Sequence, residues 1–291
     1  MQERRIDVAG RGNVRLSARV FESPGGAGAP GLLLMHGLAS SSHIWDLMLP
    51  RLVRRFRVVA YDARGHGLSA KPSAGYGFGS VMQDALAVAR AARLRRPLVV
   101  GHSWGAMVAL ELAAAGPRAL HGAVLIDGGL TSMRDSMTWK EAKERLAPPH
   151  LAGMPVEEFR GMIRMFFADA VDVTPDVEEI VLSVMHVGPD GRIRPHLARA
   201  NHVKILRAIW EQDPAGLLAR LRAPVRAIVA RSADPDDPNT PAKATAVAKA
   251  RRAARGRPLT VTWMDGIHDL PLQHPQTLCR VIERTGGGAV R

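Results

Sequence analysis

Ser103 lies between Gly101 and Gly105, and this spacing has the clearest chemical potential in the sequence. An apolar, β-branched run at 98–100 precedes it and an Ala-, Leu- and Met-rich run at 106–115 follows, which predicts a strand, a sharp turn and a helix. In that context the serine occupies the tip of a strained turn, where side chains in place of the glycines would collide with the neighbouring strand or helix. The turn exposes the hydroxyl and directs the first helical amides toward a reacting carbonyl. We therefore interpret Ser103 as a nucleophile.

The elements that would hold this serine in place form a repeating pattern. Continuous apolar runs are typical of strands in a sheet that is covered on both faces. These runs occupy residues 31–35, 58–61, 98–100, 123–126 and 225–230. Residues 13–21 alternate apolar and polar side chains, as in a half-buried strand, and a last strand is expected at 259–264. Strands separated by helical stretches predict a parallel, doubly wound sheet.

The alternation breaks between residues 131 and 212, which have helical patterns and no buried strand run. This stretch holds six of the twelve methionines. We interpret it as a helical cap, with the first part of the core at 1–130 and the second at 213–291. The underside of a cap faces the site and thioether side chains adapt to varied shapes, so Met162 and Phe166 are predicted to line an apolar pocket.

Composition narrows the class of protein. The single cysteine, Cys279, excludes an internal disulfide and a cysteine-rich metal site. The net charge of +13 is mostly arginine spread along the chain, and its densest run, 242–257, has no aromatic residue for base stacking. We interpret that run as a solvated helix face, and expect neither nucleic acid nor a membrane as partner. No apolar run follows the basic N-terminal residues, so a cytoplasmic location is expected. The oligomeric state is not indicated.

Five motifs in order give the chain a resemblance to a known family. They are His36-Gly37 after a strand, the loop from Asp62 to Ser69, the turn from Gly101 to Gly105, Asp234 after a late strand, and His268 after the last strand. Together they resemble the capped serine hydrolases of the α/β-hydrolase fold. The resemblance implies a mostly parallel, doubly wound sheet of eight strands with an inserted helical cap.

The same resemblance assigns roles to individual residues. Ser103 matches the nucleophile of the nucleophile elbow, and His268 matches the base that takes its proton. Asp234 matches the acid that orients the imidazole and stabilises its cation, which completes a catalytic triad. Arg231 stands where the family has glycine, so that turn departs from the pattern. Asp127, after an earlier strand, is the alternative acid, and it reaches only if the His268 loop leans inward.

The resemblance also implies an oxyanion hole made of two backbone amides, those of Leu38 and Trp104. Backbone donors are fixed before the reaction, so little reorganisation accompanies the developing charge. His36 and His102 are interpreted as structural residues beside the site. No metal and no organic cofactor are implied.

Departures from related branches indicate the reaction. The Ser103 turn is similar to that of haloalkane dehalogenases and epoxide hydrolases, but an alkyl-enzyme ester needs the carboxylate nucleophile that serine replaces here. The cap also lacks tyrosines, since Tyr61 and Tyr76 lie outside it. We therefore expect a serine esterase that acts on a small molecule with an apolar part, through an ester, thioester or lactone. The alternatives are carbon–carbon bond hydrolysis, perhydrolysis, a lyase or cofactor-free oxygenase reaction, or a ligand receptor on the same scaffold.

Overall fold

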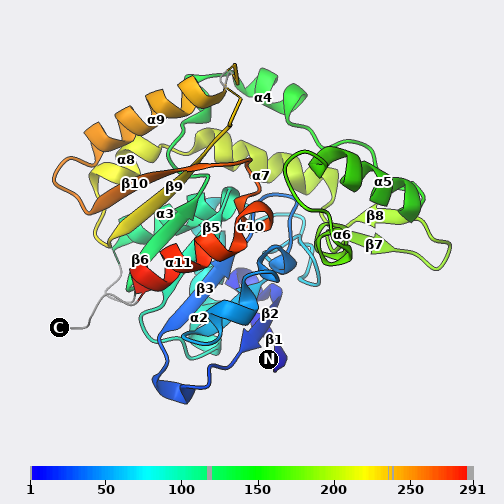
Figure 1. Ribbon diagram of the computed structural model, residues 1–291, viewed down its shortest axis with the longest axis horizontal. Coiled ribbons are helices and arrows are strands. Elements are labelled where there is room, and N and C mark those ends of the chain that lie inside the picture. Colours follow the sequence, from blue (N-terminus) through cyan, green and yellow to red (C-terminus); the bar gives the residue numbers. More distant parts are fainter. Residues whose placement is uncertain (1, 117–119, 235, 238, 287–291) are drawn as a thin grey trace.

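One eight-stranded sheet forms the centre of the molecule (Figure 1). The computed structural model describes residues 2–116, 120–234, 236–237 and 239–286. The strand order is β1-β2-β4-β3-β5-β6-β9-β10, with β1 and β2 antiparallel to their neighbours and all other pairs parallel. The strands are β1 (Glu3–Ala9), β2 (Arg15–Phe21), β3 (Gly31–Met35), β4 (Arg57–Tyr61), β5 (Leu98–His102), β6 (Gly122–Ile126), β9 (Val225–Arg231) and β10 (Leu259–Asp265). The predicted fold class and strand number are confirmed.

Helices cover both faces of this sheet because its central strands are apolar on both sides. Along β3, Leu33 belongs to one core layer and Leu34 to the other, as the two-residue period of a strand requires. The first layer packs under helices α2 (Phe78–Ala91), α3 (Trp104–Ala115), α8 (Pro214–Ala219) and α9 (Asn239–Ala253). The second packs under α1 (Leu49–Leu52), α10 (Leu270–Gln273) and α11 (Pro275–Gly286), and it includes side chains from the segment after β6.

The segment between β6 and α8 lies outside the central sheet, with α4 at the top of Figure 1 and α5, α6, β7 and β8 on its right. Its elements are η4 (Met133–Asp135), α4 (Trp139–Arg145), α5 (Val156–Phe167), α6 (Pro175–Leu182), β7 (Met185–Val187), β8 (Ile193–Pro195) and α7 (Arg199–Glu211). Thr138 and Glu141 form a capping box at the start of α4. Strands β7 and β8 pair as an antiparallel hairpin. These elements occupy the residues for which the sequence predicts a cap.

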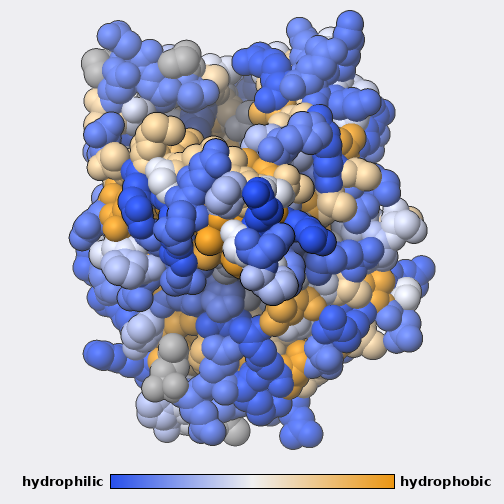
Figure 2. Space-filling model, turned by 90° about the vertical axis from the view of Figure 1, so that its right-hand side faces the viewer, coloured by the Kyte–Doolittle hydropathy of each residue, from blue (hydrophilic) through white to orange (hydrophobic). Residues whose placement is uncertain are grey.

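Helix α5 buries a face that does not include Met162 and Phe166. Phe159, Ile163 and Phe167, spaced four residues apart, are buried. Met162 and Phe166 lie on the neighbouring face and are 37% and 76% exposed. The prediction that these two side chains line an apolar pocket is therefore wrong. On this side of the molecule hydrophilic residues predominate, with small apolar patches among them (Figure 2).

The basic run predicted as a solvated helix face begins within α9. Ala246, Val247 and Ala250 are buried against the core, and most of the basic side chains of the helix are exposed. Lys243 is an exception, since only 28% of its side chain is exposed. In the described part of the chain, no helix is both long enough and apolar enough to cross a membrane.

Candidate active site

Ser103 occupies a strained turn between β5 and α3. Its backbone angles, φ 56° and ψ −117°, lie outside the regions that L residues favour. The Ser103 amide donates to the carbonyl oxygen of Ile126 at 2.9 Å, and its own carbonyl accepts from the amide of Ala106 at 3.0 Å. The turn is thus tied to the neighbouring strand β6 and to the first turn of α3. This geometry agrees with the strand, turn and helix predicted from the sequence.

The two glycines that bracket Ser103 are required by close packing. A Cβ atom on Gly101 would lie 2.1 Å from the carbonyl oxygen of Gly105. One on Gly105 would lie 2.2 Å from the carbonyl oxygen of Met35, at the end of β3. Real Cβ atoms do not approach backbone oxygen this closely, so the elbow helix can sit against the strand ends only with glycine at both positions.

His268 is held by Asp127. The His268 Nδ1 donates to Asp127 Oδ2 at 2.7 Å. Asp127 directly follows β6 and has a positive φ of 43°, a conformation that aspartate tolerates better than most residues. Because Nδ1 is used in this bond, Nε2 is left to face a substrate or a serine hydroxyl. In the described chain no hydrogen bond joins Ser103 to His268, and such contacts often tighten only when a substrate is bound.

The prediction that Asp234 contacts His268 is wrong. Asp234 is exposed, and its carboxylate accepts from the amide of Asp236 at 2.9 Å within its own loop. The His268 loop instead leans inward, because His102 Nε2 donates to the carbonyl oxygen of His268 at 2.9 Å. This bond carries His268 toward the end of β5, where the adjacent β6 presents Asp127. The alternative acid is therefore the one that meets the imidazole.

Asp127 is also paired with a lysine that the sequence analysis did not single out. Lys243 Nζ donates to both Asp127 oxygens at 2.9 Å and to the carbonyl oxygen of Ala230 at 3.0 Å. The Ala230 amide donates to Asp127 Oδ1 at 2.9 Å. The carboxylate side chain is only 4% exposed, so its charge is neutralised by these donors rather than by water. A lysine in a basic helix gives no sequence signal that distinguishes it from its solvated neighbours.

The pKa values of the pair follow from these contacts. Burial raises the pKa of Asp127, but the hydrogen bond and charge of His268 and the charge of Lys243 outweigh it, so the pKa lies below its ordinary value. Desolvation lowers the pKa of His268, but the Asp127 bond and charge prevail, so that pKa lies above its ordinary value. Lys243 opposes this increase. The imidazole is therefore a stronger base than an isolated histidine.

His36 and His102 have the structural contacts expected of them. His36 Nδ1 donates to the carbonyl oxygen of Gly37 at 2.7 Å, and Nε2 accepts from the Ala63 amide at 3.0 Å. The ring thus joins the loop after β3 to the loop after β4. Burial and the charge of His268 lower the pKa of His102 to about 4, so that ring is neutral near pH 7.

The amides of Leu38 and Trp104 lie on the two segments that meet at Ser103. Trp104 is the first residue of α3, where helical amides have no acceptor within the helix. The loop that carries Leu38 packs on the serine, since a Cβ atom on Gly37 would lie 3.1 Å from the Cβ of Ser103. Leu38 therefore follows a residue that packs against Ser103, and Trp104 follows Ser103 directly.

Hydrogen bonds and an ion pair, within the loop and to neighbouring segments, hold the loop from Asp62 to Ser69 in place. Asp62 accepts from the amides of Ser42 and Leu68 at 2.8 and 2.9 Å. In the same loop Arg64 forms a buried ion pair with Asp84 at 2.6 Å. These contacts agree with the structural role predicted for the motif.

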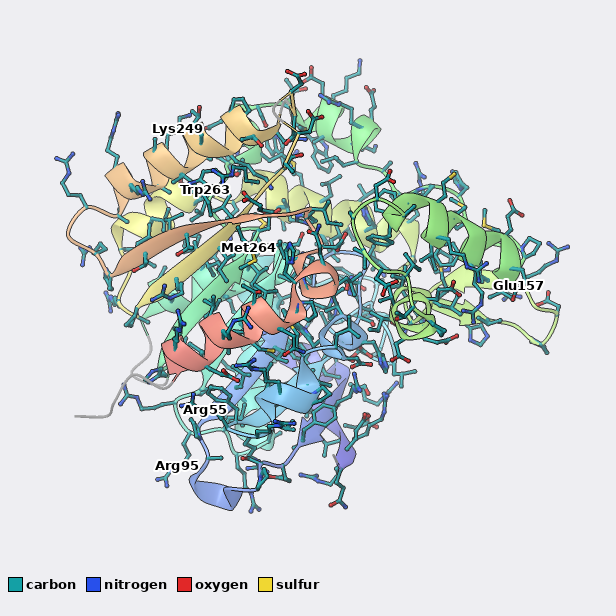
Figure 3. The ribbon with its side chains drawn as sticks, viewed as in Figure 1. Arg55, Arg95, Glu157, Lys249, Trp263 and Met264 are labelled. Carbon is teal, nitrogen blue, oxygen red and sulfur yellow. The ribbon has the colours of Figure 1, made fainter. Side chains whose placement is uncertain are left out.

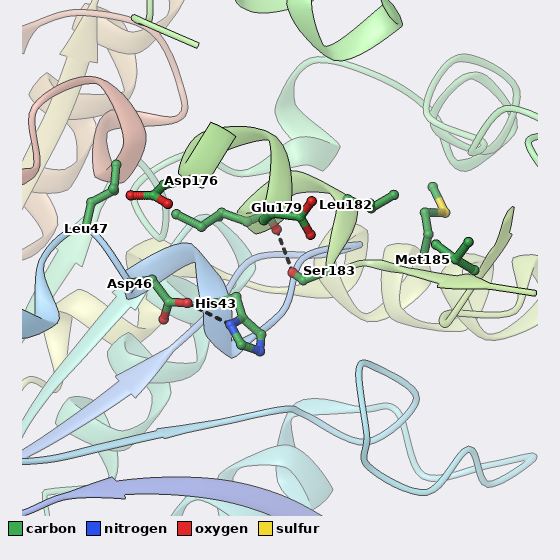
Figure 4. A pocket seen from close by; sticks show the side chains of 10 residues that line it. His43, Asp46, Leu47, Asp176, Glu179, Leu182, Ser183 and Met185 are labelled. Atoms are coloured by element: carbon green, nitrogen blue, oxygen red, sulfur yellow. Dashed lines mark hydrogen bonds and ion pairs between the residues drawn. The ribbon is translucent and has the colours of Figure 1, made fainter. Parts of the chain in front are cut away.

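Two hollows lie between the core and the segment after β6. The larger, of about 480 Å³, opens between η3 (Ser42–Trp45) and α6 and carries the acidic side chains of Asp46, Asp176 and Glu179 (Figure 4). His43 donates to Asp46 across one wall at 2.7 Å. The smaller is an apolar cavity of about 190 Å³ closer to the serine turn. Met185 lines both hollows.

The fold and the serine turn can now be compared with known proteins. Residues 30–155 match the family model described as the alpha/beta hydrolase fold. The match and the architecture agree, and the chain has the α/β-hydrolase fold. Solved structures agree with this α/β-hydrolase fold across almost the entire chain. The structure of E-2-(acetamidomethylene)succinate hydrolase has a TM-score of 0.77 and 23% identity, and covers 98% of this chain and 99% of that one. A thioesterase domain from the curacin biosynthetic pathway has a TM-score of 0.75 and 17% identity, and covers 97% and 99%.

Two curated relatives match part of this α/β-hydrolase-fold protein. One is 2-(acetamidomethylene)succinate hydrolase of Mesorhizobium japonicum, 36% identical over 124 residues, or 43% of this chain and 42% of that protein. The other is RutD of Klebsiella pneumoniae, named as a candidate carbamate hydrolase, 33% identical over 120 residues, or 41% of this chain and 45% of that protein. The chain thus matches less than half the length of each relative.

Proposed function

We propose that this protein is a serine hydrolase that cleaves a carboxylic ester, thioester or lactone through an acyl-enzyme. The observation that carries the proposal is the hydrogen bond from His268 Nδ1 to Asp127, in a loop that is tied to His102, the residue directly before the strained Ser103 turn. A nucleophile, a base and a group that orients the base are the parts that acyl transfer by serine requires. The substrate is a small molecule with an apolar part.

Each group has one task in the proposed reaction. His268 Nε2 takes the Ser103 proton while Oγ attacks the carbonyl carbon, and the amides of Leu38 and Trp104 stabilise the oxyanion. The imidazolium then protonates the leaving alcohol or thiol as its bond to the acyl carbon breaks. Water enters, gives a proton to Nε2 and attacks the acyl-enzyme, and the acid leaves as Ser103 recovers its proton. Asp127 keeps the proton on Nδ1 and stabilises the imidazolium throughout.

An amide or carbamate is the second candidate substrate class. The names of the two relatives favour an amide or a carbamate, since one name contains an acetamido group and the other refers to a carbamate. The same residues would serve, with His268 protonating a departing nitrogen in place of an oxygen. Amides are harder to cleave than esters, so a chain built for them is expected to hydrolyse activated esters as well.

The test is the hydrolysis of p-nitrophenyl butyrate by the parent and by Ser103→Ala. We expect Ser103→Ala to lower kcat by at least about a thousandfold, because loss of a nucleophile removes the covalent route. Ser232→Ala, in the Asp234 loop, is the matched control and should retain parental kcat. A fluorophosphonate should add its mass to the parent chain at Ser103 and leave Ser103→Ala unmodified. Residual activity within tenfold of the parent, or labelling elsewhere, would contradict the proposal, and a chain that binds esters without turnover would be a receptor.

A further inference from the structure

The smaller cavity has walls of an unusual composition. Its lining comes from the loops after β3 and β4, from the segment between α4 and α5, from the β7–β8 hairpin and its flanks, and from α7. Most of these residues are prolines or aliphatic side chains, and three are histidines: His66, His196 and His202. Neither lysine, arginine, aspartate nor glutamate is among its described lining residues. An apolar cavity with a few polar atoms is the usual form of a small-molecule site.

The cavity is next to the serine turn. Ala39 and Ser40 line it, and they directly follow Leu38, whose amide is a proposed oxyanion donor. On the other side, the ring of His66 stacks on the indole of Trp104 with 5.5 Å between centroids. The cavity is therefore bordered by residues that adjoin both segments beside Ser103, the loop after β3 and the start of α3.

The protonation of His66 is fixed by its surroundings. Its Nδ1 donates to the carbonyl oxygen of Arg64 at 3.0 Å, so Nε2 carries a lone pair. Burial and the charge of His36 lower the pKa of His66 to about 3, so the ring stays neutral at physiological pH. Nε2 is buried without a hydrogen-bond partner in the described chain. A buried acceptor without a partner is uncommon in folded proteins and calls for a donor from outside the chain.

His202 adds a second unpartnered nitrogen to the same cavity. Its Nδ1 is also buried without a partner, and the residue is 7% exposed. Burial lowers the pKa of His202 and of His196, so all three rings are neutral near pH 7. The walls of the cavity thus include two rings with unpartnered nitrogens and no charged side chain among the described lining residues.

We propose that this cavity receives an uncharged acyl group that carries an N–H or O–H donor, which bonds to His66 Nε2. The inference rests on the proposed acyl-enzyme function and specifies its substrate class. An apolar acyl group would leave the buried acceptor unpaired, and a site built to bond a polar group discriminates strongly against analogues that lack it. A carboxylate would enter an apolar cavity that has no cation to pair with it.

Three p-nitrophenyl esters of nearly equal shape test this inference. Their acyl groups are glutaramate, which ends in a neutral amide, glutarate, which ends in a carboxylate, and 5-methylhexanoate, which ends in two methyl groups. We expect kcat/KM for the glutaramate ester to exceed that of the 5-methylhexanoate ester by roughly tenfold or more. The glutarate ester should be the poorest of the three at pH 7.

His66→Phe assigns the preference to one atom. It keeps a planar ring against Trp104 but removes Nε2, so the ratio of kcat/KM between the glutaramate and 5-methylhexanoate esters should fall to about one. His186→Phe, an exposed histidine on β7 that does not line the cavity, is the matched control and should keep the parental ratio. His202→Phe gives a second measurement if His66→Phe fails to fold, with a smaller decrease expected.

The outcomes separate this inference from the proposed function. Cleavage of all three esters with equal efficiency, or a preference that survives His66→Phe, overturns the inference and leaves the serine hydrolase intact. If no ester is cleaved, the proposed function fails, and the cavity is tested by titrating the parent with valeramide or valerate and following tryptophan fluorescence. Tighter binding of valeramide, lost in His66→Phe, would support the cavity assignment alone. Equal or absent binding of the two would overturn it as well.

Discussion

Strands β6 and β9 are parallel neighbours, and an aspartate follows each of them, but the two carboxylates have opposite surroundings. Asp127 directly follows β6, is buried, and accepts hydrogen bonds from His268, Lys243 and the Ala230 amide. Asp234 lies three residues beyond β9, is exposed, and within the described chain its carboxylate bonds inside its own loop. Burial beside the strand that carries Ser103, and not order along the chain, therefore decides which carboxylate meets the histidine.

Asp127→Asn should have the largest effect. Asparagine keeps the shape but removes the charge that fixes the His268 tautomer, so kcat on p-nitrophenyl butyrate is expected to fall by roughly three to four orders of magnitude. Lys243 would also lose its partner, so the melting temperature should be measured alongside. The double variant Asp127→Asn/Lys243→Met should recover stability but not activity. A fall of less than tenfold in the folded single variant would remove Asp127 from the reaction.

Lys243→Met should shift the pH profile. The charged groups that face His268 are Asp127 from the end of β6, Asp269 from its own loop and Lys243 from α9, with the neutral His102 below. A cation disfavours the imidazolium, so its removal raises the pKa of His268, and the acid limb of kcat/KM should move to higher pH by roughly half to one unit.

Lys249→Met is the matched control for that experiment. Lys249 lies on the same helix and pairs with Asp135 at 2.8 Å, but both side chains are at least half exposed (Figure 3). Its replacement should leave the acid limb in place, because exposed pairs are screened by water and salt. An unchanged limb in Lys243→Met, or a limb shifted to lower pH, would show that the lysine does not act on His268.

Asp234→Asn should have the smallest effect. Its carboxylate makes no contact outside its loop in the described chain, so kcat is expected to stay within about twofold of the parent. The assay is the one used for Asp127→Asn, and the ranking of the two variants is the measurement. If Asp234→Asn were the more damaging change, the comparison between the two strand ends would be reversed.

The sequence was sufficient for features that depend on local pattern and chain order. The apolar runs predicted the sheet, and the glycines around Ser103 predicted a turn that the close approaches at Gly101 and Gly105 explain. The contact between His268 and Asp127 could not be read in this way, because it depends on how far one loop leans over the sheet. Likewise Lys243 turns inward from a helix that sequence describes only as basic, and α5 packs so that Met162 and Phe166 lie outside its buried face.

The strained backbone conformation of Ser103, which exposes its hydroxyl, lowers the stability of the fold. Its conformation opposes folding by about 1–3 kcal/mol, which the rest of the chain must supply. Glycine at this position would relieve that opposition and lose the hydroxyl, so stability and reactivity favour different residues at one site. In a library selected only for heat resistance, the elbow is therefore a place where the nucleophile would be lost early. A selection intended to improve the proposed hydrolase has to retain turnover as a criterion from its first round.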